Sequence, residues 1–373
     1  MTTTSSTPIP VSTYDPINAA ILAVSEDRIQ GFHRKPFAQI AALSGVPYDV
    51  VVERIRAMLE AGTIRRVRLT LIANDLAPGA LVAWRVAQER LDAAFDWLWK
   101  EDPFSGHIVI RSTDTEAAGS TYKLWTTLKV PQGFSLEEHC ECLQRKIGAE
   151  AFRIMPAKGI FVLGVGHVRR REIKPGSKSD TPAEMHEIKV TRLSDEEWHV
   201  LSYLKRECMP HEIGDDLWLR RAEEAGLDYE RFCAVAEGLA DKKIIGRFST
   251  FLEHVKPNAA GERVTKFNAL FHWAVPPGLE KRAGEEVGRF HALTHCYWRE
   301  AGPEFKNVNI MAVAHGTDKE LVKAHKAAID AHLNEVGIPV LYTNIFWGGR
   351  SEIKPSEILP SAYAAWRRQQ ASA

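Results

Sequence analysis

The 373-residue chain lacks an excess of charge of either sign, a long apolar run and a regular set of cysteines. Its 48 lysines and arginines balance 48 aspartates and glutamates, which argues against nucleic-acid binding through overall charge but leaves a local basic patch open. No apolar run is long enough to cross a bilayer, and the start MTTTSSTPIPVST lacks the charged and apolar parts of a signal peptide. Five cysteines without a framework predict a reducing, cytoplasmic location, and Cys208 and His211 lack the further ligands of a zinc site.

What the chain does contain is a pattern that occurs twice. Two short helical segments are separated by a turn at Ser44–Val46 and followed by the alternating segment IRRVRLTLI, which is the order of a winged helix-turn-helix. A strand–helix–strand–strand–helix–strand pattern comes next, and this order is ferredoxin-like. Both parts recur in the second half, beginning with a helix for which Ser194 is placed as the N-cap and Glu197 follows three residues on. The sequence therefore predicts an α+β fold, a tandem of winged-helix and ferredoxin-like units.

Changes in composition predict the boundaries of these parts. The segment after residue 168, RRREIKPGSKSDTPAEMHEIKV, is charged and contains serine and proline, as a linker would. The predicted ranges are 1–14 for a flexible tail, 15–75 for the first winged helix, 76–168 for the first ferredoxin-like domain, 169–190 for the linker, 191–258 for the second winged helix, 259–350 for the second ferredoxin-like domain and 351–373 for a C-terminal tail.

Polar side chains gather on two predicted strands of the second copy, in the segment THCYWREAGPEFKNVNIMAVAHG. Side chains alternate between the two faces of a strand, so His295, Tyr297 and Arg299 share one face. The same alternation places Asn309 and His315 opposite the apolar face of the next strand. Helices cover only one face of a ferredoxin-like sheet, so the five side chains would meet in one site if the sheet of the other copy closed over them.

The first copy repeats this arrangement in part. His107 and Arg111 keep the spacing of the second-copy pair and share a face, and Lys129 falls where His315 falls in the second copy. The strand before the polar segment, TKFNALFHW, is weaker evidence for the site, since its His272 could be a solvated neighbour. One copy would therefore present two histidines, and the other a histidine and a lysine.

These residues resemble those of a known family. A winged helix followed by a ferredoxin-like domain is the plan of Lrp/AsnC-type regulators, and THCYWREAGPEFKNVNIMAVAHG resembles the HCY-R…N-hydrophobic-HG signature of siroheme decarboxylases. KKIIGRFSTFLEHVK resembles that family's arginine–phenylalanine wing followed by a histidine. The family acts in heme d1 biosynthesis and in the alternative siroheme-dependent heme pathway, commonly as pairs of related subunits that are sometimes fused. The resemblance covers nearly the whole chain in architecture, while its specific motifs lie mainly in the second half.

The resemblance implies that CO₂ is removed from two acetate side chains of siroheme to give 12,18-didecarboxysiroheme. No separate organic cofactor is expected, because the macrocycle itself can take up electron density. His295 and His315 are the implied proton donors, since an imidazole titrates near neutral pH, although either could instead be an axial ligand of the siroheme iron. Arg299, Tyr297 and Arg247 would hold acetate or propionate groups. The predicted substrate-binding set is completed by Asn309, His107, Arg111 and Lys129.

Departures from the family pattern leave alternatives open. The first copy reads HIVIRSTDTEAAGSTYKLWTTLKVP where a full signature is expected, and Ser249 stands where the family tends to have glycine. An enzyme with one site, or a heme or siroheme carrier without catalysis, are both compatible with this loss. A transcriptional regulator is a further hypothesis, but Asp49 and Glu53 lie among the arginines of the predicted recognition helix, so specific DNA binding is not expected. Homo-oligomers and partners from the same pathway stay open.

Overall fold

The computed structural model describes residues 9–72, 76–77, 79–164, 172–188, 190–253, 257, 261 and 264–372. Most of the predicted N-terminal tail, residues 1–8, lies outside these ranges. The chain divides into two compact units, and each unit contains residues from both sequence copies. The first unit comprises mainly residues 1–72 and 193–264, and the second comprises residues 73–164, 172–192 and 265–373.

The first unit contains helices of both copies and one small sheet. Local signals account for its helix ends: Gly45 follows α2 with a φ of 71°, and Ser194 and Glu197 form a capping box at α6, as the sequence predicts. The sheet has the order β1-β8-β2, so a strand of the second copy lies between two strands of the first. The elements are α1 (Pro16–Ser25), β1 (Ile29–Gln30), α2 (Pro36–Ser44), α3 (Tyr48–Glu60), β2 (Ile64–Leu71), α6 (Asp195–Leu204), η3 (Pro210–Glu212), α7 (Leu217–Glu224), α8 (Tyr229–Asp241) and β8 (Ile245–Leu252).

The second unit contains the two strand–helix–strand–strand–helix–strand segments in the order that the sequence predicts, which confirms the mixed α+β class. The first segment consists of β3 (Gly79–Arg85), α4 (Leu91–Glu101), β4 (Ser105–Ser112), β5 (Leu124–Lys129), α5 (Leu136–Ile147) and β6 (Ala151–Leu163). The second consists of β9 (Phe267–Ala274), α9 (Glu280–Val287), β10 (Leu293–Arg299), β11 (Ile310–Gly316), α10 (Lys319–Glu335) and β12 (Tyr342–Ile353).

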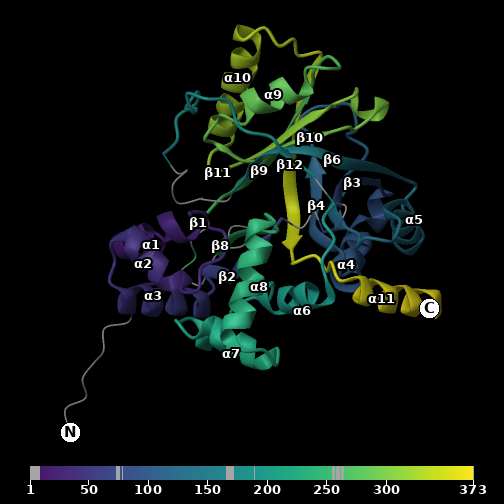
Figure 1. Cartoon of the computed structure of the whole chain (residues 1–373). Helices are drawn as coiled ribbons and strands as arrows, with labels where there is room; N and C mark the ends of the chain where they lie inside the picture. The colour runs from purple at the N-terminus through teal and green to yellow at the C-terminus, as the bar shows by residue number, and fades with distance from the viewer. Residues whose placement is uncertain are drawn as a thin grey trace. The chain divides into compact units, whose positions relative to one another are not determined.

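Strands of both segments form one closed sheet (Figure 1). Its order among the described residues is β10-β11-β9-β12-β4-β5-β3-β6-β7, and β10 also pairs with β6. β6 pairs with β3 through Ala151–Pro156 and with β10 through Ala157–Leu163. β12 likewise pairs with β9 through Tyr342–Gly348 and with β4 through Trp347–Ile353. The last strand of each copy therefore pairs with the second strand of the other, and the two sheets join edge to edge instead of closing face to face.

Apolar clusters fill both sides of this sheet. Because side chains alternate along each strand, one face packs on helices and the other faces the inside of the closed sheet. Helices α4 and α5 cover strands of the first copy, and α9 and α10 cover strands of the second (Figure 1). Inside, Trp125, Phe305, Met311 and Phe346 belong to a separate apolar cluster.

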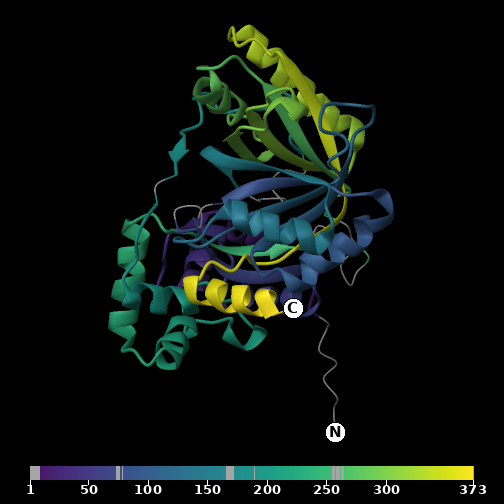
Figure 2. The ribbon, with the colours of Figure 1, turned by 90° about the vertical axis from the view of Figure 1, so that its right-hand side faces the viewer.

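The described residues of two segments, the predicted linker from residue 172 on and the predicted C-terminal tail, belong to the second unit. Residues His186–Glu187 form β7, which pairs with β6, and Ala183 donates its N–H to the carbonyl of Glu285 at 2.9 Å. The C-terminal segment forms α11 (Pro360–Ser372), which lies beside the helices of the first copy (Figure 2). Buried Trp366 of α11 joins the first copy's core, so apolar burial holds a segment that its composition alone marks as a tail.

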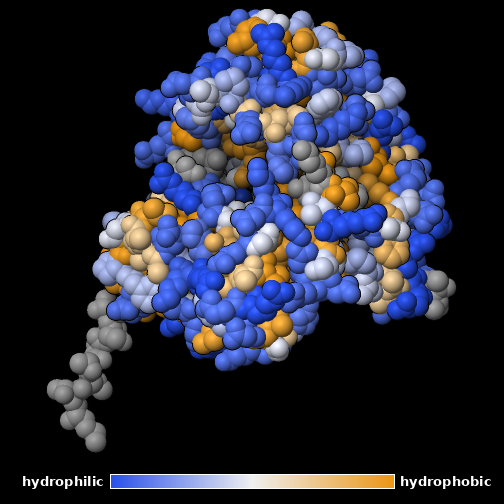
Figure 3. Space-filling model, in the orientation of Figure 1, coloured by the Kyte–Doolittle hydropathy of each residue, from blue (hydrophilic) through white to orange (hydrophobic). Residues whose placement is uncertain are grey.

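The surface of the molecule mixes residue types. On the face seen in Figure 3, small hydrophobic patches are scattered among hydrophilic residues. Within the described ranges, no helix has both the length and the apolar character needed to cross a membrane.

Candidate functional site

The inner face of the closed sheet carries the candidate site. On β10, His295, Tyr297 and Arg299 share that face, since the residues between them pack on the helix side. His315 on β11 lies two residues after Val313, which packs against the inner cluster. The alternation argument is therefore correct for these four predicted site residues.

A chain of hydrogen bonds connects five side chains near one end of the sheet. Arg111 on β4 donates from Nη1 to Oδ1 of Asn268 on β9 over 3.2 Å, and Nδ2 of Asn268 lies 3.1 Å from Nε2 of His315. Nδ1 of His315 lies 3.3 Å from Oγ1 of Thr294, which in turn lies 3.0 Å from Nδ1 of His295. Arg111 belongs to the first copy and the other four residues to the second. The fold thus joins three predicted residues through two that were not predicted.

Tyr297 and Arg299 extend the row of side chains along β10. The ring of Tyr297 stacks on that of His295, with centroids 6.1 Å apart and planes inclined by 17°. The guanidinium carbon of Arg299 lies 4.5 Å from the centroid of Tyr297, a cation–π distance, and Nη1 donates to the carbonyl of Met155 at 2.6 Å. Arg299 therefore contacts this row of side chains through the ring of Tyr297. The guanidinium that is hydrogen-bonded to the chain of histidines is that of Arg111.

Both inner arginines are buried cations. Arg111 is 4% exposed and Arg299 is 7% exposed. Desolvation lowers the pKa of Arg111 to about 9 and that of Arg299 to about 10, because burial disfavours the charged form, and no carboxylate of the described residues offsets either shift. The Nε atom of Arg111 has no hydrogen-bond partner among the described residues. A negatively charged ligand group would compensate for such buried charge.

Asn309 does not share this face, which corrects the sequence expectation. Its Oδ1 accepts the N–H of Val275 and its Nδ2 donates to the carbonyl of the same residue, both over 2.9 Å. β11 begins only at Ile310, and Asn307 before it has a φ of 55°, so the alternation of the strand cannot be extended back to Asn309. Its amide serves to hold the backbone that follows β9.

Three further predicted residues, His107, Lys129 and Arg247, lie on β4, β5 and β8. Nε2 of His107 on β4 lies 2.7 Å from Oγ of Ser351 on β12, and Lys129 on β5 pairs in register with Gly79. The chain from Arg111 to His295 includes neither of them. Arg247 lies on β8 of the first unit and is buried. Roles for these three residues in ligand binding stay predictions.

His272 is fully buried and is therefore not a solvated neighbour of the site. Its ring lies among aromatic rings, 5.0 Å from that of Phe346 and 6.0 Å from that of Trp125 between centroids. Neither ring nitrogen has a hydrogen-bond partner among the described residues. Desolvation, with the nearby charges of Arg111 and Lys326, lowers the pKa of His272 to about 3. This imidazole is neutral at physiological pH.

Sequence reasoning missed Asn268 and Thr294. Asn268 lies four residues before His272 on β9, so the alternation that grouped the histidines also places it on the inner face. Thr294 precedes His295, and a register shift between Leu293 and His295 interrupts the regular alternation there. Strand alternation in the sequence could have identified Asn268. The position of Thr294 depends on the register shift between paired strands, which the sequence does not indicate.

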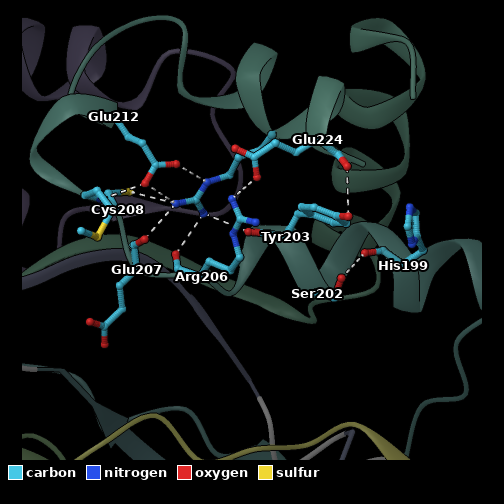
Figure 4. A network of polar contacts seen from close by, with 10 residues as sticks. His199, Ser202, Tyr203, Arg206, Glu207, Cys208, Glu212 and Glu224 are labelled. Carbon is cyan, nitrogen blue, oxygen red and sulfur yellow. Dashed lines mark hydrogen bonds and ion pairs between the residues drawn. The ribbon is translucent and has the colours of Figure 1, made fainter. Parts of the chain in front are cut away.

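In the first unit, Cys208 belongs to a structural network (Figure 4). The guanidinium of Arg221 donates from Nε to Glu212 at 3.0 Å and lies 3.8 Å from the sulfur of Cys208. Burial raises the pKa of the Cys208 thiol to about 12. No group of three or more metal-binding side chains occurs in the part of the chain that the structure describes. Arg221 also donates to the carbonyls of Tyr203, Arg206 and Glu207.

The helices predicted to contact DNA use their charged side chains within the first unit. On α3, Arg56 donates to the carbonyls of Pro210 and Ile213, at 3.1 and 2.9 Å. On α8, Glu230 and Glu237 each form an ion pair with Arg34 of the first copy. Arg56 on α3 is thus bound to backbone carbonyls. Helix α8 presents carboxylates, which repel phosphate groups.

Comparisons with known proteins agree with the two-copy arrangement. Residues 77–161 and 265–345 match the family model described as the AsnC-like ligand binding domain. Among curated proteins, none matches the sequence.

Two solved structures share the fold of nearly the whole chain. The crystal structure of the siroheme decarboxylase NirDL has a TM-score of 0.65 and 17% sequence identity, and the match covers 95% of this chain and 98% of that one. The same enzyme in co-complex with an iron-uroporphyrin III analogue gives the same TM-score and identity, over 95% of this chain and 99% of that one. At this identity the likeness establishes a common fold.

Proposed function

We propose that this chain, whose two matched stretches belong to the AsnC-like ligand-binding domains, binds siroheme and removes CO₂ from two of its acetate side chains. The observation that carries the proposal is the inner face of the closed sheet, where two buried arginines that have no carboxylate partner among the described residues lie on the same face as two histidines. A ligand with several carboxylates would supply the missing negative charge. The shared fold of the siroheme decarboxylase NirDL, also known with an iron-uroporphyrin III analogue, supports this choice of ligand class.

The reaction requires that the carboxylate be held in a fixed orientation and that a proton be delivered to the carbon that loses CO₂. The bond between the acetate CH₂ and its carboxylate breaks, CO₂ leaves, and the carbon keeps the electron pair and takes up a proton, so that a methyl group remains. Arginine orients carboxylates well because its planar guanidinium can donate two parallel hydrogen bonds. A histidine can give up a proton near neutral pH, and such general acids contribute about 10²- to 10⁴-fold to a rate. Arg111 and Arg299 would hold carboxylates, and the histidines would supply the proton.

The direct test is to incubate the purified full chain with siroheme in the absence of oxygen and to follow the products by mass. We expect loss of one and then two CO₂, together with a shift of the absorbance spectrum when siroheme is titrated into the protein. A spectral shift without any loss of carboxyl groups would instead indicate a carrier. Siroheme that stays unchanged under conditions in which a known decarboxylase acts would rule out the reaction.

Specific DNA binding is not expected from this chain. Arg56 is engaged by the backbone around η3, and α8 carries Glu230 and Glu237, so the clustered cations that phosphates require are missing from both helices. We predict no tight, salt-sensitive gel shift with promoter DNA from the neighbourhood of the gene. A nanomolar complex that weakens steeply as salt is raised would favour the regulator instead.

A further inference from the structure

We propose that His332 is a pH-dependent switch, which holds residues 177–185 of the predicted linker against the second copy while its ring is neutral and loosens them when the ring is protonated. His332 lies on α10 and is 5% exposed. Its Nδ1 lies 2.8 Å from Nζ of Lys178 in the linker, and its Nε2 lies 2.6 Å from Oε2 of Glu286 on α9. One imidazole thus connects a cation of the linker to a carboxylate of a helix.

The chemistry of these two contacts specifies the protonation state in which both can form. An ammonium group only donates hydrogen bonds, so Nδ1 of His332 must accept from Lys178 and carries no hydrogen. The hydrogen of the neutral ring is then on Nε2, which donates it to the carboxylate of Glu286. Only the neutral ring, with its hydrogen on Nε2, satisfies both partners.

Protonation of the ring removes the first contact and keeps the second. The charged ring has a hydrogen on each nitrogen, so Nδ1 can no longer accept from Lys178, and two cations face each other. Glu286 keeps its bond to Nε2, although it is shared with Arg289 at 2.8 Å, and Glu335 of α10 lies 3.9 Å from Nδ1. Because these two carboxylates favour the charged ring, Lys178 is the group that is displaced as the pH falls.

Lys178 belongs to a segment that packs on the second copy. Ser179 donates its N–H to the carbonyl of Arg289 at 3.0 Å, and Nε of Arg289 donates to the carbonyl of Ser179 at 2.9 Å. Further along the segment, Ala183 and Met185 pack against the apolar cluster that contains Cys296 of β10. The segment is therefore part of the core on the helix side of β10, whose other face carries the candidate site.

Hydrogen exchange of the full-length protein, followed by mass spectrometry at pH 7.5 and pH 5.5, measures this contact. Rates are divided by the chemical exchange rate at each pH. We expect residues 177–185 to exchange about 10-fold faster at pH 5.5 on this scale, because a hydrogen bond from a charged group is lost. Helix α4, which belongs to the same unit and contains no histidine, serves as the internal reference.

Two substitutions should remove the pH dependence without removing the contact. In His332→Gln the amide oxygen can accept from Lys178 and the amide nitrogen can donate to Glu286 at either pH. In Lys178→Gln the amide can donate to the neutral ring and accept from the charged ring. His291→Gln is the matched control, because the His291 ring contacts Ser177 and Ser179 of the same segment, and this variant should behave like the wild type.

The state of the ring can also be observed directly. Nitrogen-15 NMR of histidine-labelled protein distinguishes ring nitrogens with and without hydrogen, and His332→Gln identifies the signals. At pH 7.5 we expect a hydrogen on Nε2 and none on Nδ1, and a ring with its hydrogen on Nδ1 would overturn the switch.

The exchange experiment has equally definite outcomes. Equal exchange of residues 177–185 at both pH values in the wild type would contradict the proposal. So would a pH dependence that persists in His332→Gln or Lys178→Gln, or one that disappears in His291→Gln. None of these measurements requires siroheme, so the switch and the proposed decarboxylation are tested separately.

Discussion

Arg111 and Arg299, on the inner face of the closed sheet, are buried and have no carboxylate partner among the described residues. A guanidinium buried without a carboxylate is costly, and removal of one partner from a buried charged pair typically destabilises a protein by about 3–5 kcal/mol. Arg111 and Arg299 nevertheless lie on corresponding strands of the two copies and donate to backbone carbonyls there, those of Phe346 and Met155. We interpret both as residues kept for a ligand and not for stability.

Replacing Arg111 by methionine tests this interpretation. The substitution keeps an unbranched side chain and removes the charge and the bond to Asn268. Because a hydrogen bond to a charged group contributes about 1.5–3 kcal/mol, we expect siroheme to bind about 10- to 100-fold more weakly in an absorbance titration. Arg350→Met is the control, since Arg350 is exposed and pairs with Asp92 on the surface. Equal affinity of both variants would show that Arg111 does not hold the ligand.

His272 makes a prediction about pH and stability. Its pKa is about 3 in the folded chain and near 6.5 when unfolded, so only the unfolded state takes up a proton between these values. Stability therefore is at its full value above pH 6.5 and falls as the pH is lowered toward 3, by about 1.4 kcal/mol per pH unit from this group. In urea unfolding, wild type should lose about 1.4 kcal/mol more than His272→Gln between pH 7.5 and pH 5.5. Equal losses would mean that the ring is not held neutral.

At the scale of elements, the C-terminal helix shows how packing overrides composition. On α11, Tyr363 and Trp366 are buried against Phe104 and His139 of the first copy, and Trp366 Nε1 donates to the carbonyl of Glu101 at 3.0 Å. Such aromatic burial contributes more than the weak helical preference of an isolated segment.

Truncation of the Trp366 side chain should therefore lower the free energy of unfolding. We expect Trp366→Ala to lower the free energy of unfolding by about 3–5 kcal/mol, as large-to-small changes in a core do. Gln369→Ala on the same helix, an exposed position, should change it by less than about 0.5 kcal/mol. Urea unfolding followed by circular dichroism measures both. Similar small effects would indicate that α11 is not part of the core in solution.

At the scale of the whole molecule, the exchange of last strands makes the second unit a single structure. β6 and β12 each pair with strands of both copies, so Arg111 on one copy reaches Asn268 on the other. The inner face of the closed sheet therefore contains side chains of both repeats that are joined by a hydrogen bond.

A double-mutant cycle measures this connection between the copies. We predict that Arg111→Met and Asn268→Leu are not additive in the free energy of unfolding, with a coupling of about 0.5–3 kcal/mol, because each removes the same hydrogen bond. The control cycle uses Lys319 and Asp114, an exposed ion pair that also joins the copies and should couple less strongly. Additive effects at Arg111 and Asn268 would contradict the bond.

Much of the site was predictable because strand alternation is a local property. His295, Tyr297, Arg299 and His315 share a face in the sequence pattern and in the structure alike. For Asn309 the same reasoning predicted the wrong face, because the backbone before β11 departs from strand geometry. The winged helices and the roles of the site residues remain predictions.

The sequence by itself determined the two repeats, the order of their strands and helices, and which polar side chains share a face, because periodicity, capping and turn residues act over a few neighbours. Tertiary structure decided that the sheets join by exchanging their last strands, that Arg111 and not Arg299 is hydrogen-bonded to the histidine chain, and that His272 is buried. Those features depend on contacts between residues more than a hundred positions apart, and no local pattern specifies which distant strand edge will pair.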